Sequence, residues 1–125
     1  MKNLIENIRS YIPFEDKELQ IIESLFKTVK VRNGECILAE GQICKNIYYV
    51  NSGCFKACYI NDGKENVLDF FLEDHWFVEL GSFINESPTS FFIEAIEDSD
   101  LYSLSKEKFE ELIEIIIGNI FIGDY

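Results

Sequence analysis

Cysteine and histidine, the residue types that most often hold metals or carry redox chemistry, are few in this sequence. There is one histidine, His75, and there are four cysteines: Cys36, Cys44, Cys54 and Cys58. Cys54 and Cys58 are an even number of residues apart on one predicted strand, so we expect them to share a face. A two-cysteine metal site needs further ligands, and the spacing is not CxxC. Reduced cysteines are commonly buried as small apolar side chains, so a cysteine-based redox sensor is only the lesser alternative.

The motifs of the common enzyme classes are also missing from the sequence. It contains no nucleophile–histidine–acid set, no phosphate-binding Walker loop and no GxGxxG, and its seven glycines sit at predicted turns. A metalloenzyme of cupin type would need several histidine ligands, and only His75 is present. We therefore expect no enzymatic activity and no metal.

The charge of the chain is strongly negative and unevenly spread. Its 125 residues carry 23 acids and 11 bases, which gives a net charge of −12. The only arginines are Arg9 and Arg32, and no Lys or Arg occurs between Lys64 and Lys106. Such a chain should not hold a nucleic-acid backbone by itself and should be repelled by anionic membranes. With no signal peptide and no apolar run long enough to span a bilayer, a cytoplasmic protein is expected.

The hydrophobic pattern predicts one domain, residues 1–125, in three parts. Residues 1–27 have apolar side chains at helical spacing and are predicted to be helical. Residues 28–104 contain short β-branched and aromatic runs cut by turn signals, of which Asp62-Gly63 is the strongest hairpin signal. Many short strands at such turn spacing are typical of a sandwich, a jelly roll or a barrel, so the pattern predicts a mainly β fold with flanking helices.

Residues 105–125 form the third part, a predicted helix with Ser105 as its N-cap. Its apolar residues follow helical spacing and make one broad stripe: Phe109, Leu112, Ile113, Ile116, Ile117 and Ile120. A stripe of this kind marks an interface, so a homodimer through this helix is expected. The competing interpretation is that the stripe folds back on its own roll.

The ordered turn residues of the β region resemble a known family. Gly34-Glu35, Gly41, the strand Ile47–Val50 with Ser52-Gly53, Asp62-Gly63, and Phe77–Leu80 occur in the order typical of the cyclic-nucleotide-binding domain of the Crp/Fnr superfamily of bacterial transcription regulators. The resemblance covers about residues 14–117. It implies a mainly β fold with flanking helices, a double-stranded β-roll (jelly-roll or cupin-like) of cyclic-nucleotide-binding type. It also implies a dimerisation helix after the roll, and DNA contact only through a helix-turn-helix domain that these 125 residues lack.

The resemblance also locates a candidate effector pocket. Its candidate residues are Glu79, Leu80, Thr89 and Ser90. Glu79 matches the glutamate that contacts the ribose hydroxyl in the family, whereas Val78 replaces a glycine and Pro88 or Thr89 stands where the phosphate-binding arginine is found. A buried phosphate needs a cation or a fan of backbone amides, and this acidic segment has no cation.

These departures predict that cyclic nucleotides bind weakly or not at all, and that any effector is another small molecule. The function expected is that of an effector-sensing regulatory domain of a Crp/Fnr-type transcription regulator. The alternative is a ligand-free dimerisation or protein-interaction module.

Overall fold

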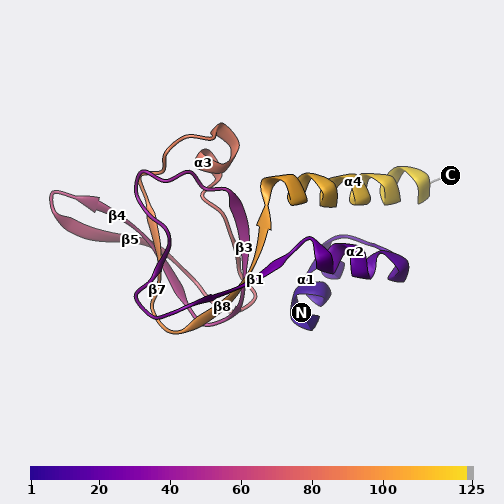
Figure 1. Ribbon diagram of the computed structural model, residues 1–125, viewed down its shortest axis with the longest axis horizontal. Helices are drawn as coiled ribbons and strands as arrows, with labels where there is room; N and C mark the ends of the chain where they lie inside the picture. Colours follow the sequence, from indigo (N-terminus) through magenta and orange to yellow (C-terminus); the bar gives the residue numbers. More distant parts are fainter. Residues whose placement is uncertain (124–125) are drawn as a thin grey trace.

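The computed structural model describes residues 1–123, with side chains as far as residue 118. Two four-stranded antiparallel sheets, ordered β1-β8-β3-β6 and β2-β7-β4-β5, face each other and form a roll, and helices gather at one end of it (Figure 1). The predicted fold class, a β-roll with flanking helices, is confirmed. The elements in chain order are α1 (Lys2–Tyr11), the 3-10 helix η1 (Asp16–Glu18), α2 (Leu19–Ser24), β1 (Lys27–Val31), β2 (Cys36–Leu38), β3 (Asn46–Ser52), β4 (Phe55–Asn61), β5 (Lys64–Phe71), β6 (Trp76–Phe77), α3 (Leu80–Asn85), β7 (Phe92–Ala95), β8 (Ser99–Ser105) and α4 (Lys106–Gly123).

The interior of the roll contains an aromatic stack centred on Phe77. The Phe77 ring lies 4.5 Å from the Phe71 ring and 5.2 Å from the Tyr48 ring, both nearly parallel, and 5.8 Å from the Phe55 ring. Stacked and tilted ring pairs at these separations are favourable beyond the area that they bury. The two sheets are therefore joined by aromatic side chains from β3, β4, β5 and β6.

A second core lies on the outer face of the sheet that contains β3 and β8. Alternation along β3 sends Tyr48 into the roll and Tyr49 to the other face, where Tyr49 packs with Leu4 and Ile8 of α1 and with Leu112 of α4. Figure 1 shows α1, α2 and α4 together beside this sheet. The helices are thus held by a sheet whose opposite face lines the roll.

The Asp62-Gly63 turn forms the predicted hairpin between β4 and β5. Both residues have positive φ, 52° and 75°, as the type I′ hairpin turn requires. The expectation that Cys54 and Cys58 share a face of one strand is wrong. β4 begins after Cys54, and the β4–β5 register shifts between Ala57 and Cys58. All four cysteines are free thiols.

Helix α4 divides the predicted stripe between two surroundings. Leu112 is buried, and Phe109 and Ile116 pack with it against α1 and the outer face of the sheet. Ile113 is outside both core clusters, and Ile117 is 46% exposed. The side chain of Ile120, also in the predicted stripe, lies outside the described residues. No helix among the described residues is long and apolar enough to cross a membrane.

Candidate effector site

The four predicted site residues lie at the two ends of one segment that runs from the start of α3 to β7. Glu79 is half-buried, and its Oε2 accepts a hydrogen bond from the Ser82 amide at 3.3 Å, which makes it the N-cap of α3. Leu80 and Ser90 are exposed, whereas Thr89 is 3% exposed. Glu79 therefore stabilises a helix in this state, and Thr89 is the only one of the four that is buried.

Thr89 is clamped to the loop between β2 and β3. Its amide donates to the Gln42 carbonyl at 2.8 Å, and its carbonyl accepts from the Gly41 amide at 2.9 Å. Its hydroxyl oxygen accepts from the Phe91 amide at 3.1 Å. Thr89 lies in the segment where the family resemblance indicates an arginine. Its backbone and its hydroxyl are both already hydrogen-bonded within the chain.

Ser82, a residue that sequence reasoning did not single out, ties α3 to the same loop. Ser82 is 2% exposed, and its hydroxyl accepts a hydrogen bond from the Cys44 amide at 2.8 Å and donates to the Ser87 carbonyl at 2.5 Å. Because Cys44 is 38 residues away in the chain, no local signal in the sequence could have predicted this contact.

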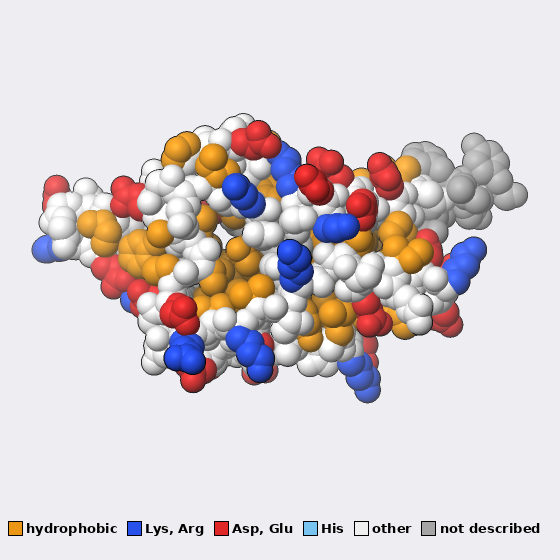
Figure 2. Space-filling view, viewed as in Figure 1, with side chains coloured by type: hydrophobic (Ala, Val, Ile, Leu, Met, Phe, Trp, Pro, Cys, Tyr) orange, Lys and Arg blue, Asp and Glu red, His pale blue; other side chains and the backbone are white. Residues whose placement is uncertain are grey.

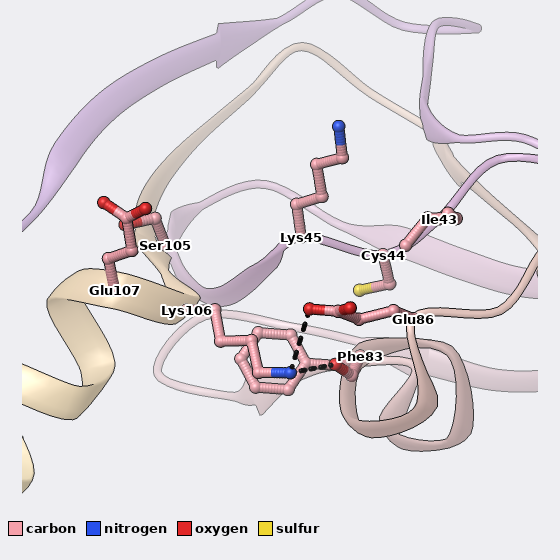
Figure 3. Close-up of a pocket in the computed structure, with 8 residues that line it drawn as sticks. All are labelled: Ile43, Cys44, Lys45, Phe83, Glu86, Ser105, Lys106 and Glu107. Atoms are coloured by element: carbon pink, nitrogen blue, oxygen red, sulfur yellow. Dashed lines mark hydrogen bonds and ion pairs between the residues drawn. The ribbon is translucent and has the colours of Figure 1, made fainter.

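The structure also brings a cation to this segment. It is Lys106, the first lysine or arginine after Lys64 in the sequence. Figure 3 shows the Lys106 side chain, at the start of α4, reaching the end of α3. Its Nζ donates to the Phe83 carbonyl at 3.3 Å and lies 3.5 Å from Glu86 Oε1. The same ammonium lies 5.8 Å from the centre of the Phe83 ring, so this cation is already neutralised and shared.

These contacts join α3 to α4. The Phe83 ring meets the Phe109 ring of α4 edge-on, with centroids 6.3 Å apart. Beside them is a cavity of about 560 Å³, lined by α3, the β2–β3 loop and the first residues of α4, with Glu86 and Glu107 among its walls (Figure 3). On the face shown in Figure 2, hydrophobic side chains also line a hollow over the roll, with Lys and Arg side chains around it.

Comparison with known proteins shows which family of domains has this fold. The sequence model of the cyclic nucleotide-binding domain matches residues 28–115. The chain belongs to the cyclic nucleotide-binding domain family. In this member the segment that follows β6 is acidic, and the one lysine that reaches it among the described residues comes from α4.

Solved structures share the fold of this cyclic nucleotide-binding domain at low identity. The sensor domain of the transcriptional regulator DNR from Pseudomonas aeruginosa has a TM-score of 0.76 and 20% identity, over 94% of this chain and 81% of that chain. The Thermus thermophilus catabolite activator protein has a TM-score of 0.73 and 22% identity, over 93% and 55%. The regulatory subunit of a cAMP-independent protein kinase A from Trypanosoma cruzi, bound to guanosine, has 0.71 and 18%, over 95% and 44%.

The chain spans about half of the Thermus protein and less than half of the Trypanosoma subunit. A search of curated protein sequences gave no significant match. At these identities the structural likeness establishes the β-roll fold, and the family match establishes the kind of domain. The nature of any effector must therefore be argued from the side chains of this chain.

Proposed function

We propose that this domain is the effector-sensing part of a regulator of Crp/Fnr type, and that it does not bind cyclic nucleotides tightly. The observation that carries the proposal is the state of the phosphate-binding segment. Thr89 is buried and clamped, and Lys106, the one cation that reaches the segment among the described residues, is paired with Glu86. An anionic phosphate placed there would meet the carboxylates of Glu79 and Glu86 and no cation from the segment itself.

A thermal shift assay with cAMP tests this part of the proposal. A ligand at a hundredfold its dissociation constant adds about 2.7 kcal/mol to the free energy of unfolding and raises the melting temperature by several degrees. We expect no such rise with 1 mM cAMP or cGMP. AMP at the same concentration is the control for unspecific effects of a nucleotide. A clear rise with cAMP that AMP does not produce would refute the proposal.

The route from the roll to α4 supports a sensing role. Lys106 and Phe109 hold the first turn of α4 against Phe83 of α3, and Ser82 holds α3 to the β2–β3 loop. A ligand that binds better to one arrangement of α3 than to another would shift the population of α4 positions. In a regulator, α4 would carry that shift to whatever the helix joins.

We further propose that α4 pairs with α4 of a second copy. Ile113 and Ile117 are one helical turn apart, and Ile117 is 46% exposed, so the two present an apolar strip that the chain's own cores do not cover. Glu110 and Glu114 are exposed. Glu110 is seven residues before Ile117 and shares its face, so repulsion between the carboxylates of the two copies opposes this pairing.

Sedimentation velocity at micromolar concentration tests the dimer. We expect Ile117→Glu to give a monomer while its melting temperature stays close to that of the parent chain. Ile21→Glu is the matched control, because Ile21 is 53% exposed on α2 and is not part of the α4 strip, and it should leave the dimer intact. Ile116 is a poor choice because it packs inside the chain's own second core. A parent chain that is monomeric would overturn this part of the proposal.

The second candidate, a dimerisation or interaction module that senses nothing, is favoured by the aromatic stack. Phe77 and its neighbours stack in the interior of the roll, so a ligand there would have to bind beside these rings or displace them. The two candidates differ in one observable: a sensing domain must gain stability from a small molecule, and a ligand-free module must not.

A further inference from the structure

A second cavity, of about 430 Å³, adjoins the one beside α4 and is lined by β2, the β2–β3 loop and β3. Its walls are partly apolar and partly polar. The apolar part comes from Ile37, Leu38 and the ring of Tyr48, and the polar part from Gln42, Lys45 and Asn46. Leu38 and Tyr48 belong to the buried core of the roll, so the floor of the cavity is rigid. The volume is in the range of small-molecule sites.

The charge of this cavity is unusual for so acidic a chain. Although the protein has 23 acidic residues, none of them lines the cavity, whereas the neighbouring cavity has Glu86 and Glu107 in its walls. Lys45 is exposed at the border of the two cavities and lines both of them, and its ammonium makes no ion pair among the described residues. Figure 3 shows the Lys45 side chain extending away from Glu86 and Lys106. The cavity therefore combines one unpaired cation with the absence of any carboxylate.

Neutral hydrogen-bonding groups stand beside this cation. The Asn46 Nδ2 donates to the Tyr48 hydroxyl at 3.4 Å, which leaves the hydrogen of that hydroxyl available to a ligand. Burial raises the pKa of Tyr48, so the phenol stays protonated at neutral pH. Gln42 is held in place because its Oε1 accepts from the Ala39 amide at 2.9 Å. A single charge in a protein of net charge −12 suits a monoanion better than a phosphate dianion.

We propose that this cavity binds a small organic monocarboxylate, with the carboxylate at Lys45 and an apolar body against Ile37 and Leu38. The site differs from the segment around Glu79 and Thr89 that the family resemblance indicates. It is connected to that segment by hydrogen bonds, because Gly41 and Gln42 are bonded to Thr89. Any regulatory consequence of binding rests on the proposed function, whereas binding itself does not.

The experiment is an NMR titration of the ¹⁵N-labelled chain with 4-phenylbutyrate as the probe and 4-phenylbutanamide as its neutral counterpart. We expect saturable shifts of the Gly41, Gln42 and Lys45 amides with the carboxylate, and binding about tenfold weaker with the amide, because only the carboxylate can pair with the ammonium. Lys45→Gln should weaken carboxylate binding about tenfold and make the two probes equivalent.

Lys27→Gln is the matched control, because it removes the same charge from an exposed position on β1 that does not line the cavity. It should leave the affinity unchanged. The proposal is overturned if 4-phenylbutyrate gives no saturable shifts in the β2–β3 loop, if Lys45→Gln binds as tightly as the parent, or if the shifts centre on Lys106 and Glu107 instead. Because the titration needs neither a dimer nor a moving α4, failure of the proposed function would leave its result unaffected.

Discussion

Ser82 gives the sharpest test of how the candidate site is held together. Its buried hydroxyl accepts from the Cys44 amide and donates to the Ser87 carbonyl, so one oxygen joins α3, the segment after it and the β2–β3 loop. Ser82→Ala removes both hydrogen bonds. The cap of α3 survives, because Glu79 bonds to the Ser82 amide and not to its side chain.

The magnitude follows from what the substitution leaves behind. An unpaired buried donor or acceptor costs about 1 to 3 kcal/mol, and here one of each is created. With partial relaxation toward water we expect a loss of about 2 to 3 kcal/mol in the free energy of unfolding. For a chain of this length that corresponds to a fall in melting temperature of roughly 8 to 12 °C.

Urea denaturation and hydrogen exchange measure the two parts of this expectation. The denaturation midpoint should fall, and the Cys44 amide should exchange faster than in the parent chain. Ser87→Ala is the control, because Ser87 takes part only through its backbone carbonyl and its removal should change stability by less than about 0.5 kcal/mol. If Ser82→Ala is as stable as Ser87→Ala, the hydroxyl does not join these segments and the reasoning fails.

Two further predictions concern turns and pH. In urea denaturation, Gly53→Ala should destabilise the domain by at least about 3 kcal/mol and Gly63→Ala by about 1 kcal/mol. Both glycines have positive φ, but an added Cβ at Gly53 would lie 2.8 Å from the Ser99 Cα, whereas one at Gly63 would have no atom within 4 Å. Equal losses of stability in the two variants would contradict this explanation. The hydrogen bond from Lys56 lowers the pKa of Glu65 below its ordinary value of 4.5. The stability that this ion pair adds to the folded state is therefore present above about pH 4.5 and is lost as the pH falls through the lowered pKa. The difference in melting temperature between the parent and Glu65→Gln should therefore be largest near neutral pH and vanish in acid, and a difference that grows in acid would show that the ion pair is not its source.

Much of the architecture could be predicted from local sequence. The short strands cut by turn signals, the Asp62-Gly63 turn and the helical spacing before and after the β region are signals between neighbouring residues. They predicted a mainly β fold, its hairpin and the terminal helices, and the family resemblance of the turn residues added the roll. Ser105 could be recognised as the N-cap of α4 for the same reason, and its hydroxyl does accept from the Lys108 amide. Boundaries were less exact: α1 ends at Tyr11, and Ile12 is already extended.

The sequence by itself determined the charge of the chain, its family pattern and the absence of any Lys or Arg between Lys64 and Lys106. Only the tertiary structure decided how that absence is met, because Lys106 is brought beside α3 by a contact between residues 23 apart in the chain. The same holds for Ser82 and Thr89, whose hydrogen bonds to the β2–β3 loop exist only once the two sheets have closed. Spacing along a chain specifies which side chains share a face, but which faces meet depends on packing between distant segments.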